Sequence, residues 1–137
     1  MNQLKEHRDL LARVANDMNM EPEKKMDIMM GSFTSMMSQG LKIVNPKKGG
    51  EYVGKYAKDN KESINKILDD VANWQKSLGP LQKAALAVRM TQKTYAKDAV
   101  DLIPKFRRKY KQIKFVANLT KGISSRIFGF GLDKLVN

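Results

Sequence analysis

One glycine-rich segment has the spacing of a phosphate-binding loop. Residues 49–55 read GGEYVGK and match the pattern G-x-x-x-x-G-K, in which glycine amides wrap phosphates and a following Ser or Thr hydroxyl binds magnesium. The next residue here is Tyr56, which has the wrong size and reach for that task, and residues 41–44 are too short a run for the strand that should precede the loop. We therefore interpret the segment as a flexible basic loop that contributes three auxiliary cations to a wider basic surface: Lys47, Lys48 and Lys55.

Side chains suited to acid–base or metal chemistry are few. The single histidine, His7, lies on the apolar stripe of an expected helix, where a core or boundary imidazole is the common role. Asp98 and Asp101 share a helix face and could bind a metal with help from elsewhere, but surface ion pairing with nearby lysines explains them more simply. The chain contains no cysteine, which excludes disulfides and thiolate chemistry. We expect a protein that is not an enzyme and that uses no cofactor or metal.

The strongest signal is the segment FRRKYKQIKF at residues 106–115, which holds five cations, three aromatics and no acid. At 100° per residue, Phe106, Tyr110 and Ile113 form a core-facing stripe, and the cations occupy the rest of the circumference. Phe115 points almost opposite Phe106, among the cations, where an aromatic ring suits contact with something negative and flat or apolar. The predicted anion-binding residues lie on this face and in its continuation: Lys105, Arg107, Arg108, Lys111, Lys114, Phe115, Lys121 and Arg126.

The charge balance along the chain supports a negative partner. Residues 102–137 hold nine Lys and Arg against one acid, so a net charge of +8 out of the total of +12 lies in the last quarter of the chain. The span 102–132 carries eight cations and no acid at all. Such a field repels itself unless an anionic partner offsets it.

Three classes of partner fit this field. Nucleic acid ranks first, because small, strongly basic all-α domains without cysteine most often bind it. Lysine and arginine would neutralise phosphates, and aromatic rings would stack on bases. The first alternative is an anionic membrane surface, with apolar residues near the C-terminus entering the interface. The second alternative is an acidic protein, which this chain would dock as an inhibitor or as a structural component of a virion or larger assembly. The sequence does not separate DNA from RNA.

The elements that must position these residues have helical periodicity almost throughout. Helices are expected from the first residues to about Met18, from Pro22 to Gly40, from a cap at Asn60 to Leu78, and onward from Pro80. The run 45–50, NPKKGG, predicts a loop, and Pro104 predicts a helix break. The expected fold is all-α: a single compact domain of five or six helices with a basic amphipathic C-terminal segment. Its parts are a Met-rich helical pair at 1–44, a loop with a short element at 45–59 and a basic helical part at 60–137.

Seven of the nine methionines lie between Met18 and Met37. Thioether side chains fill irregular cores, and they also suit surfaces that adapt to a partner. A core helix is the preferred interpretation, and a face for a second copy or a protein partner is the alternative. The residues concerned are Met26, Met29, Met30, Phe33, Met36 and Met37.

The sequence also suggests where the protein resides. The start, MNQLKEHRDLLARV, carries charges throughout and lacks the apolar region of a signal peptide. The longest uncharged run, 28–41, has fourteen residues and is too short to span a bilayer. We expect an intracellular or virion-associated protein without a transmembrane segment. Within the domain, Trp74 continues the apolar stripe of its helix and is expected to be largely buried.

Overall fold

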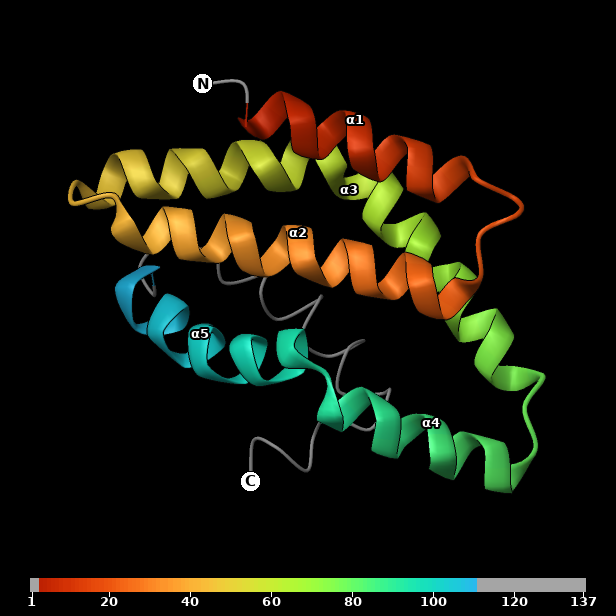
Figure 1. The fold of residues 1–137 in the computed structure, drawn as a ribbon. Coiled ribbons are helices and arrows are strands. Elements are labelled where there is room, and N and C mark those ends of the chain that lie inside the picture. Colours follow the sequence, from red (N-terminus) through yellow and green to blue (C-terminus); the bar gives the residue numbers. More distant parts are fainter. Residues whose placement is uncertain (1–2, 111–137) are drawn as a thin grey trace.

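The computed structural model describes residues 3–110, except for the side chains at positions 95, 96, 99, 100, 103, 106, 107 and 110. These residues form helices without a β-strand, which confirms the predicted all-α class (Figure 1). None of the described helices is long and apolar enough to cross a membrane. The described residues end at position 110, so they do not give the number of helices in the whole chain. The predicted basic C-terminal segment extends beyond them. The helices are α1 (Gln3–Asn16), α2 (Pro22–Lys42), α3 (Pro46–Lys76), α4 (Pro80–Gln92) and α5 (Thr94–Tyr110).

The helix α2 lies at the centre of the arrangement, with α1 and α3 on one side and α5 on the other (Figure 1). Hydrogen bonds give the directions of the chains. The His7 ring packs against Tyr56 in the first half of α3, and Lys66, further along α3, bonds to Asn16 at the end of α1, so α1 and α3 run parallel. Lys93 bonds to Asp27 near the start of α2, and Lys109 bonds to its end. The helix α5 therefore runs beside α2 in the same direction.

Prolines start three of the helices, as their fixed φ and missing N–H favour at the first helical position. The helix starts at Pro22 and Pro80 are as predicted. The prediction of a loop with a short element at 45–59 is wrong, because α3 covers these residues from Pro46 onward. The Asn45 side chain accepts bonds from the backbone N–H of Lys47 at 3.0 Å and of Lys48 at 3.4 Å, and Pro46 follows it as the first helical residue. This cap begins a 31-residue helix whose length outweighs the low helix propensity of its two early glycines.

Two other expected boundaries also move. Asn60 is not a cap, because it lies inside α3, is fully buried and donates from Nδ2 to the Tyr56 carbonyl at 2.9 Å. The helix after Pro80 ends at Gln92, and α5 continues through Pro104, where a break was expected. The break lies at Lys93, whose backbone is extended (ψ 144°) and whose side chain is held by acids of α2. A tertiary ion pair, rather than the proline, thus marks the boundary.

The core lies where α1, α2 and α3 meet. Side chains from α1 such as Leu11 and from α3 such as Ile67 complete it, and Leu86 and Met90 of α4 join the same cluster. Trp74 is partly buried and packs against the edge of this core. The Met-rich stripe of α2 is core, and its use as an exposed partner face is corrected, because each of its members is 0% exposed: Met26, Met29, Met30, Phe33, Met36 and Met37.

Candidate polyanion-binding surface

The helix α5 carries the described part of the predicted anion-binding face. Lys105 and Arg108 are exposed on it. Arg107, Phe106 and Tyr110 have their backbones in α5, but their side chains are outside what the structure describes. Their predicted roles, as a cation and as two core residues, are untested. The remaining predicted residues lie outside the described residues altogether: Lys111, Ile113, Lys114, Phe115, Lys121 and Arg126.

Lys109 has a different role from its basic neighbours, and the sequence analysis did not single it out. Its Nζ donates to the backbone carbonyl of Leu41 at 2.7 Å and to that of Ile43 at 2.8 Å. These carbonyls belong to the C-terminal end of α2, where the helix dipole concentrates partial negative charge. The ammonium therefore holds the last turn of α5 against the end of α2. A helical wheel could not reveal this contact, because its partners are 66 and 68 residues away in the chain.

The contact brings two sets of exposed cations to the same end of the molecule. Lys42 ends α2, and Lys47 and Lys48 lie in the first turn of α3, which contains no acid. The N-terminus of α3, which is the positive end of its helix dipole, lies at this same end of the molecule. Lys105 and Arg108 come from the end of α5, which Lys109 fixes there. We call the five exposed cations the basic corner: Lys42, Lys47, Lys48, Lys105 and Arg108.

Lys55, the third auxiliary cation of the sequence analysis, is exposed on α3. It follows Lys48 by seven residues, so the two share a helix face at 100° per residue. The segment that contains it is helix rather than a glycine loop, and Gly49, Gly50 and Tyr56 are buried. A phosphate-binding loop is therefore absent at residues 49–55. Lys55 extends the basic corner along α3.

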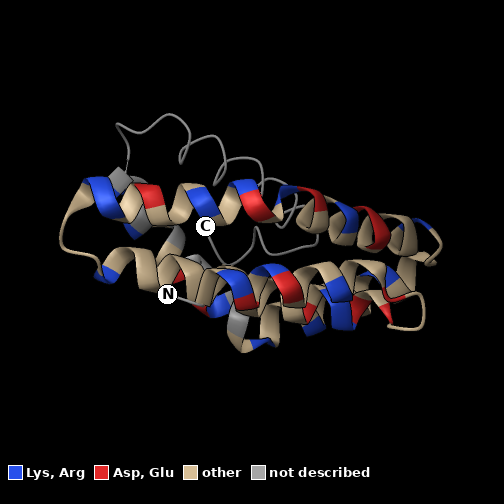
Figure 2. Ribbon diagram, turned by 90° about the horizontal axis from the view of Figure 1, so that it is seen from above, with Lys and Arg blue, Asp and Glu red and all other residues tan. Residues whose placement is uncertain are grey.

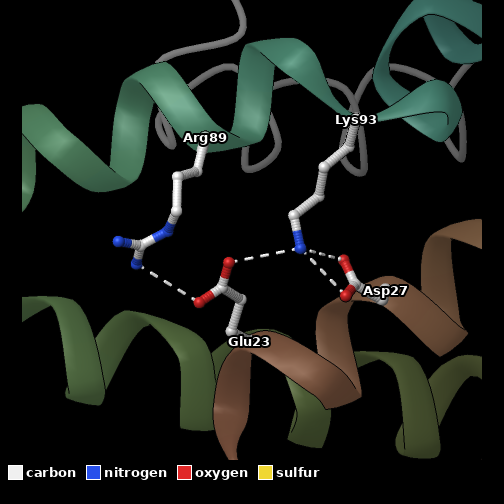
Figure 3. Close-up of polar contacts among 4 residues, drawn as sticks. All are labelled: Glu23, Asp27, Arg89 and Lys93. Atoms are coloured by element: carbon white, nitrogen blue, oxygen red, sulfur yellow. Dashed lines mark hydrogen bonds and ion pairs between the residues drawn. The ribbon is translucent and has the colours of Figure 1, made fainter.

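Cations and acids are interspersed along much of α1, α2 and α3 (Figure 2), whereas α4 carries cations only. One cluster joins the α4–α5 junction to the start of α2 (Figure 3). Arg89 bonds to Glu23 at 3.3 Å, and Lys93 bonds to Glu23 at 3.2 Å and to Asp27 at 2.8 Å. Partial burial alone would raise the pKa of Glu23, but the hydrogen bonds and charges of Lys93 and Arg89 outweigh it and lower that pKa. Arg89 and Lys93 therefore hold the α4–α5 junction against the start of α2.

Ser32 and His7 form a hydrogen-bonded pair of the residue types that serve as catalytic nucleophile and base, but the Ser32 hydroxyl lies in the interior. Ser32 Oγ is 2.7 Å from His7 Nδ1 and 2.9 Å from the Tyr56 hydroxyl, and Ser32 is 5% exposed. The His7 ring packs edge-on against Tyr56. His7 is thus a boundary imidazole that fastens α1 to α2 and α3, although its buried Nε2 has no hydrogen-bond partner among the described residues.

A groove of about 500 Å³ separates α2 from α5 in the region of Asp98 and Asp101. Hydroxyl side chains of Thr34, Ser35 and Ser38 line its α2 side. Both aspartates are exposed, and the described residues contain no group of three His, Asp or Glu side chains arranged to hold a metal. The groove therefore has a mixed polar lining and no defined ligand set.

Comparisons with protein-family models, with curated proteins and with solved structures give no match for this chain. The candidate site is consequently defined by its own chemistry. Of the features above, the basic corner is the one that combines exposure, like charge and contributions from separate helices.

Proposed function

We propose that this protein is a non-enzymatic nucleic-acid-binding protein that contacts phosphates through the basic face of residues 105–126. The observation that carries the proposal is the acid-free span 102–132 with its eight cations. Its described members Lys105 and Arg108 are exposed and form no ion pair with another described residue, in contrast to Arg89 and Lys93. Exposed cations in an acid-free field are suited to phosphate contacts, because each contact releases a counterion.

Binding is tested with labelled single-stranded DNA, duplex DNA and RNA by fluorescence anisotropy at two or more salt concentrations. The proteins compared are the wild type, Lys105→Ala/Arg108→Ala and the control Lys24→Ala/Lys83→Ala. The control removes two exposed cations that lie elsewhere, on the first turn of α2 and on α4. We expect the first variant alone to lose affinity. On duplex DNA its log–log salt slope should fall by about 0.9 for each lost phosphate contact.

Two further arms test the alternatives. Vesicles with and without anionic lipid report a membrane surface, and a polyglutamate chain reports an acidic protein partner. Binding to anionic vesicles without binding to any nucleic acid would replace the proposal with a membrane role, in which each lost cation weakens association by ~1 kcal/mol. Equal losses in the α5 variant and in the control would show that net charge, rather than this face, is responsible.

A further inference from the structure

The contact between Lys109 and α2 has a consequence for the shape of the binding surface. Arg108 and Lys105 belong to one helix, whereas Lys42 ends α2 and Lys47 and Lys48 begin α3, on either side of the short connection between those two helices. Nothing in the local sequence places these groups together, since some 60 residues separate them. The two hydrogen bonds from Lys109 Nζ, at 2.7 and 2.8 Å, join the end of α5 directly to that connection.

The chemistry of this contact makes it a strong and specific clamp. Its donor is charged, its acceptors are carbonyls at a helix C-terminus, and charge-assisted bonds of this kind are shorter and stronger than neutral ones. Lys109 is half-buried, while Lys105 and Arg108 beside it are exposed. One cation of the basic stretch is therefore directed at the protein itself, and its neighbours are left facing solvent.

We propose that Lys109 is a positioning residue that unites the α5 cations with Lys42, Lys47 and Lys48, so that one extended polyanion contacts both elements of the basic corner at once. The inference rests on the proposed function and adds a second contact region to it. A polyanion strand bound in this way crosses from α5 to the first turn of α3. Lys109 contributes by holding that geometry and makes no phosphate contact of its own.

The test compares two single variants that each remove one charge from α5. Lys109→Met removes the clamp and keeps the apolar stem, and Lys105→Met removes an exposed cation one turn earlier. On the best-bound labelled nucleic acid, Lys105→Met should lower the salt slope by about 0.9 for duplex DNA or about 0.7 for a single strand. Lys109→Met should lower affinity further, by at least as much as Lys47→Ala/Lys48→Ala does. Lys109→Arg should restore binding, because a guanidinium can also donate to two carbonyls.

A double-mutant cycle supplies a readout that a purely structural role would not change. In the wild-type background, the effects of Lys47→Ala/Lys48→Ala and of Arg108→Ala should be coupled by more than about twofold, since they contact one ligand across a fixed gap. In the Lys109→Met background the coupling should vanish. Additive effects in the wild type, or Lys109→Met behaving like Lys105→Met, would overturn the inference while leaving the proposed function intact.

Hydrogen exchange of the unbound full-length protein separates failure of this inference from failure of the proposed function. Lys109→Met should speed amide exchange at the ends of α2 and α5, whereas Lys105→Met should not. If the wild type binds no polyanion, the proposed function and the shared surface both fall, and the exchange result alone then judges the clamp. If Lys109→Met loses its helical circular dichroism, Lys109→Gln, which keeps a neutral donor, replaces it with the same expected order of affinities.

Discussion

Among the described side chains, the contacts of α1–α3 are mainly apolar, whereas α4 and α5 meet α2 through several charged contacts, with Leu102 of α5 also packed against the core. The first three bury apolar side chains against one another, with Leu11, Phe33 and Ile67 fully inaccessible. By contrast, α4 buries Leu86 and Met90 but leaves Leu81 87% exposed. The junction of α4 with α5 meets α2 through the cluster of Glu23, Asp27, Arg89 and Lys93, and the end of α5 meets α2 through Lys109.

The difference matters because the two kinds of contact respond to different conditions. Burial of apolar surface is insensitive to moderate salt and to pH, whereas partly exposed ion pairs are weakened by salt and by titration of either partner. The α1–α3 part is not free of polar groups, since Lys25 bonds to Asp70 at 3.0 Å with its own side chain only 7% exposed. Its apolar contacts nevertheless greatly outnumber such pairs. The α5 members of the basic corner, Lys105 and Arg108, thus lie on the part held by salt-sensitive contacts, whereas Lys42, Lys47 and Lys48 lie on the apolar part.

The largest expected effect comes from breaking the apolar part. Phe33→Ala should lower the free energy of unfolding by about 3–5 kcal/mol, because it removes a ring that is 0% exposed and leaves a cavity among methionines. Urea unfolding followed by circular dichroism measures this loss. Thr34→Ala, at the adjacent and partly exposed position, is the control and should change stability far less. A loss for Phe33→Ala below 1 kcal/mol would show that this core is not the main source of stability.

The next effect comes from the ion-pair cluster. Glu23→Gln/Asp27→Asn should weaken the attachment of α4 and α5 by about 1–2 kcal/mol, a value reduced from that of fully buried charged hydrogen bonds because the groups are partly exposed. Amide exchange should rise in α4 and α5 while protection in α1–α3 persists. Glu62→Gln, an exposed acid on α3, is the matched control. Uniform loss of protection across all helices would contradict the proposed division of the molecule.

The features that could be predicted from the sequence are those that local patterning determines. The all-α class, the starts at Pro22 and Pro80 and the core-facing stripe of α2 follow from helical periodicity and from proline at the first helical turn. In each case the deciding residues lie within one or two turns of each other. The preference for a core rather than a partner role for the methionines is confirmed for the same reason.

The features that were missed depend on groups distant in sequence. The helix beginning at Pro46 contains strong local breaker signals, which the Asn45 cap and burial of the following turns override. The break at Lys93 depends on acids 66 and 70 positions earlier in the chain. In the sequence Lys109 is one more cation of a basic run, and only its contact with the carbonyls of α2 distinguishes it. Five of the eight predicted anion-binding residues lie outside the described residues, as does the side chain of Arg107, and their roles rest on composition.

Mild acid should distinguish the two parts of the molecule. Burial lowers the pKa of His7 from 6.5, and Glu6 of its own helix opposes this only in part. The ring faces Ser32 of α2 and Tyr56 of α3, and burial raises the pKa of that phenol, so Tyr56 stays neutral in acid. A base whose folded pKa is lowered binds more protons when unfolded, so stability is complete above pH 6.5 and declines below it.

In the wild type, this decline in stability should be accompanied by faster amide exchange in α1. The decline should be absent in His7→Gln, whose side chain does not titrate. The α4–α5 attachment has a different window. Because the pKa of Glu23 is lowered from 4.5, its contribution is present above that pH and is lost only as the pH falls below it. Amide exchange measured at about pH 7.5, 5.5 and 4 therefore separates the His7 effect on α1 from the Glu23 effect on α4 and α5. If α4 and α5 open before α1 on acidification, the assignment of these groups is wrong.

The smallest effect concerns the outer face of α4. Helical periodicity places Leu81, Ala85 and Val88 on one apolar stripe, but Leu81 is 87% exposed and Val88 is 56% exposed. Leu86, which is 2% exposed, takes the buried position instead. Leu81→Ser should therefore change the free energy of unfolding by no more than about 0.5 kcal/mol, whereas Leu86→Ala should cost about 2–5 kcal/mol. Urea unfolding of the two variants side by side measures both, and comparable losses would mean that the stripe is covered in solution and that α4 packs through the face the periodicity first indicated.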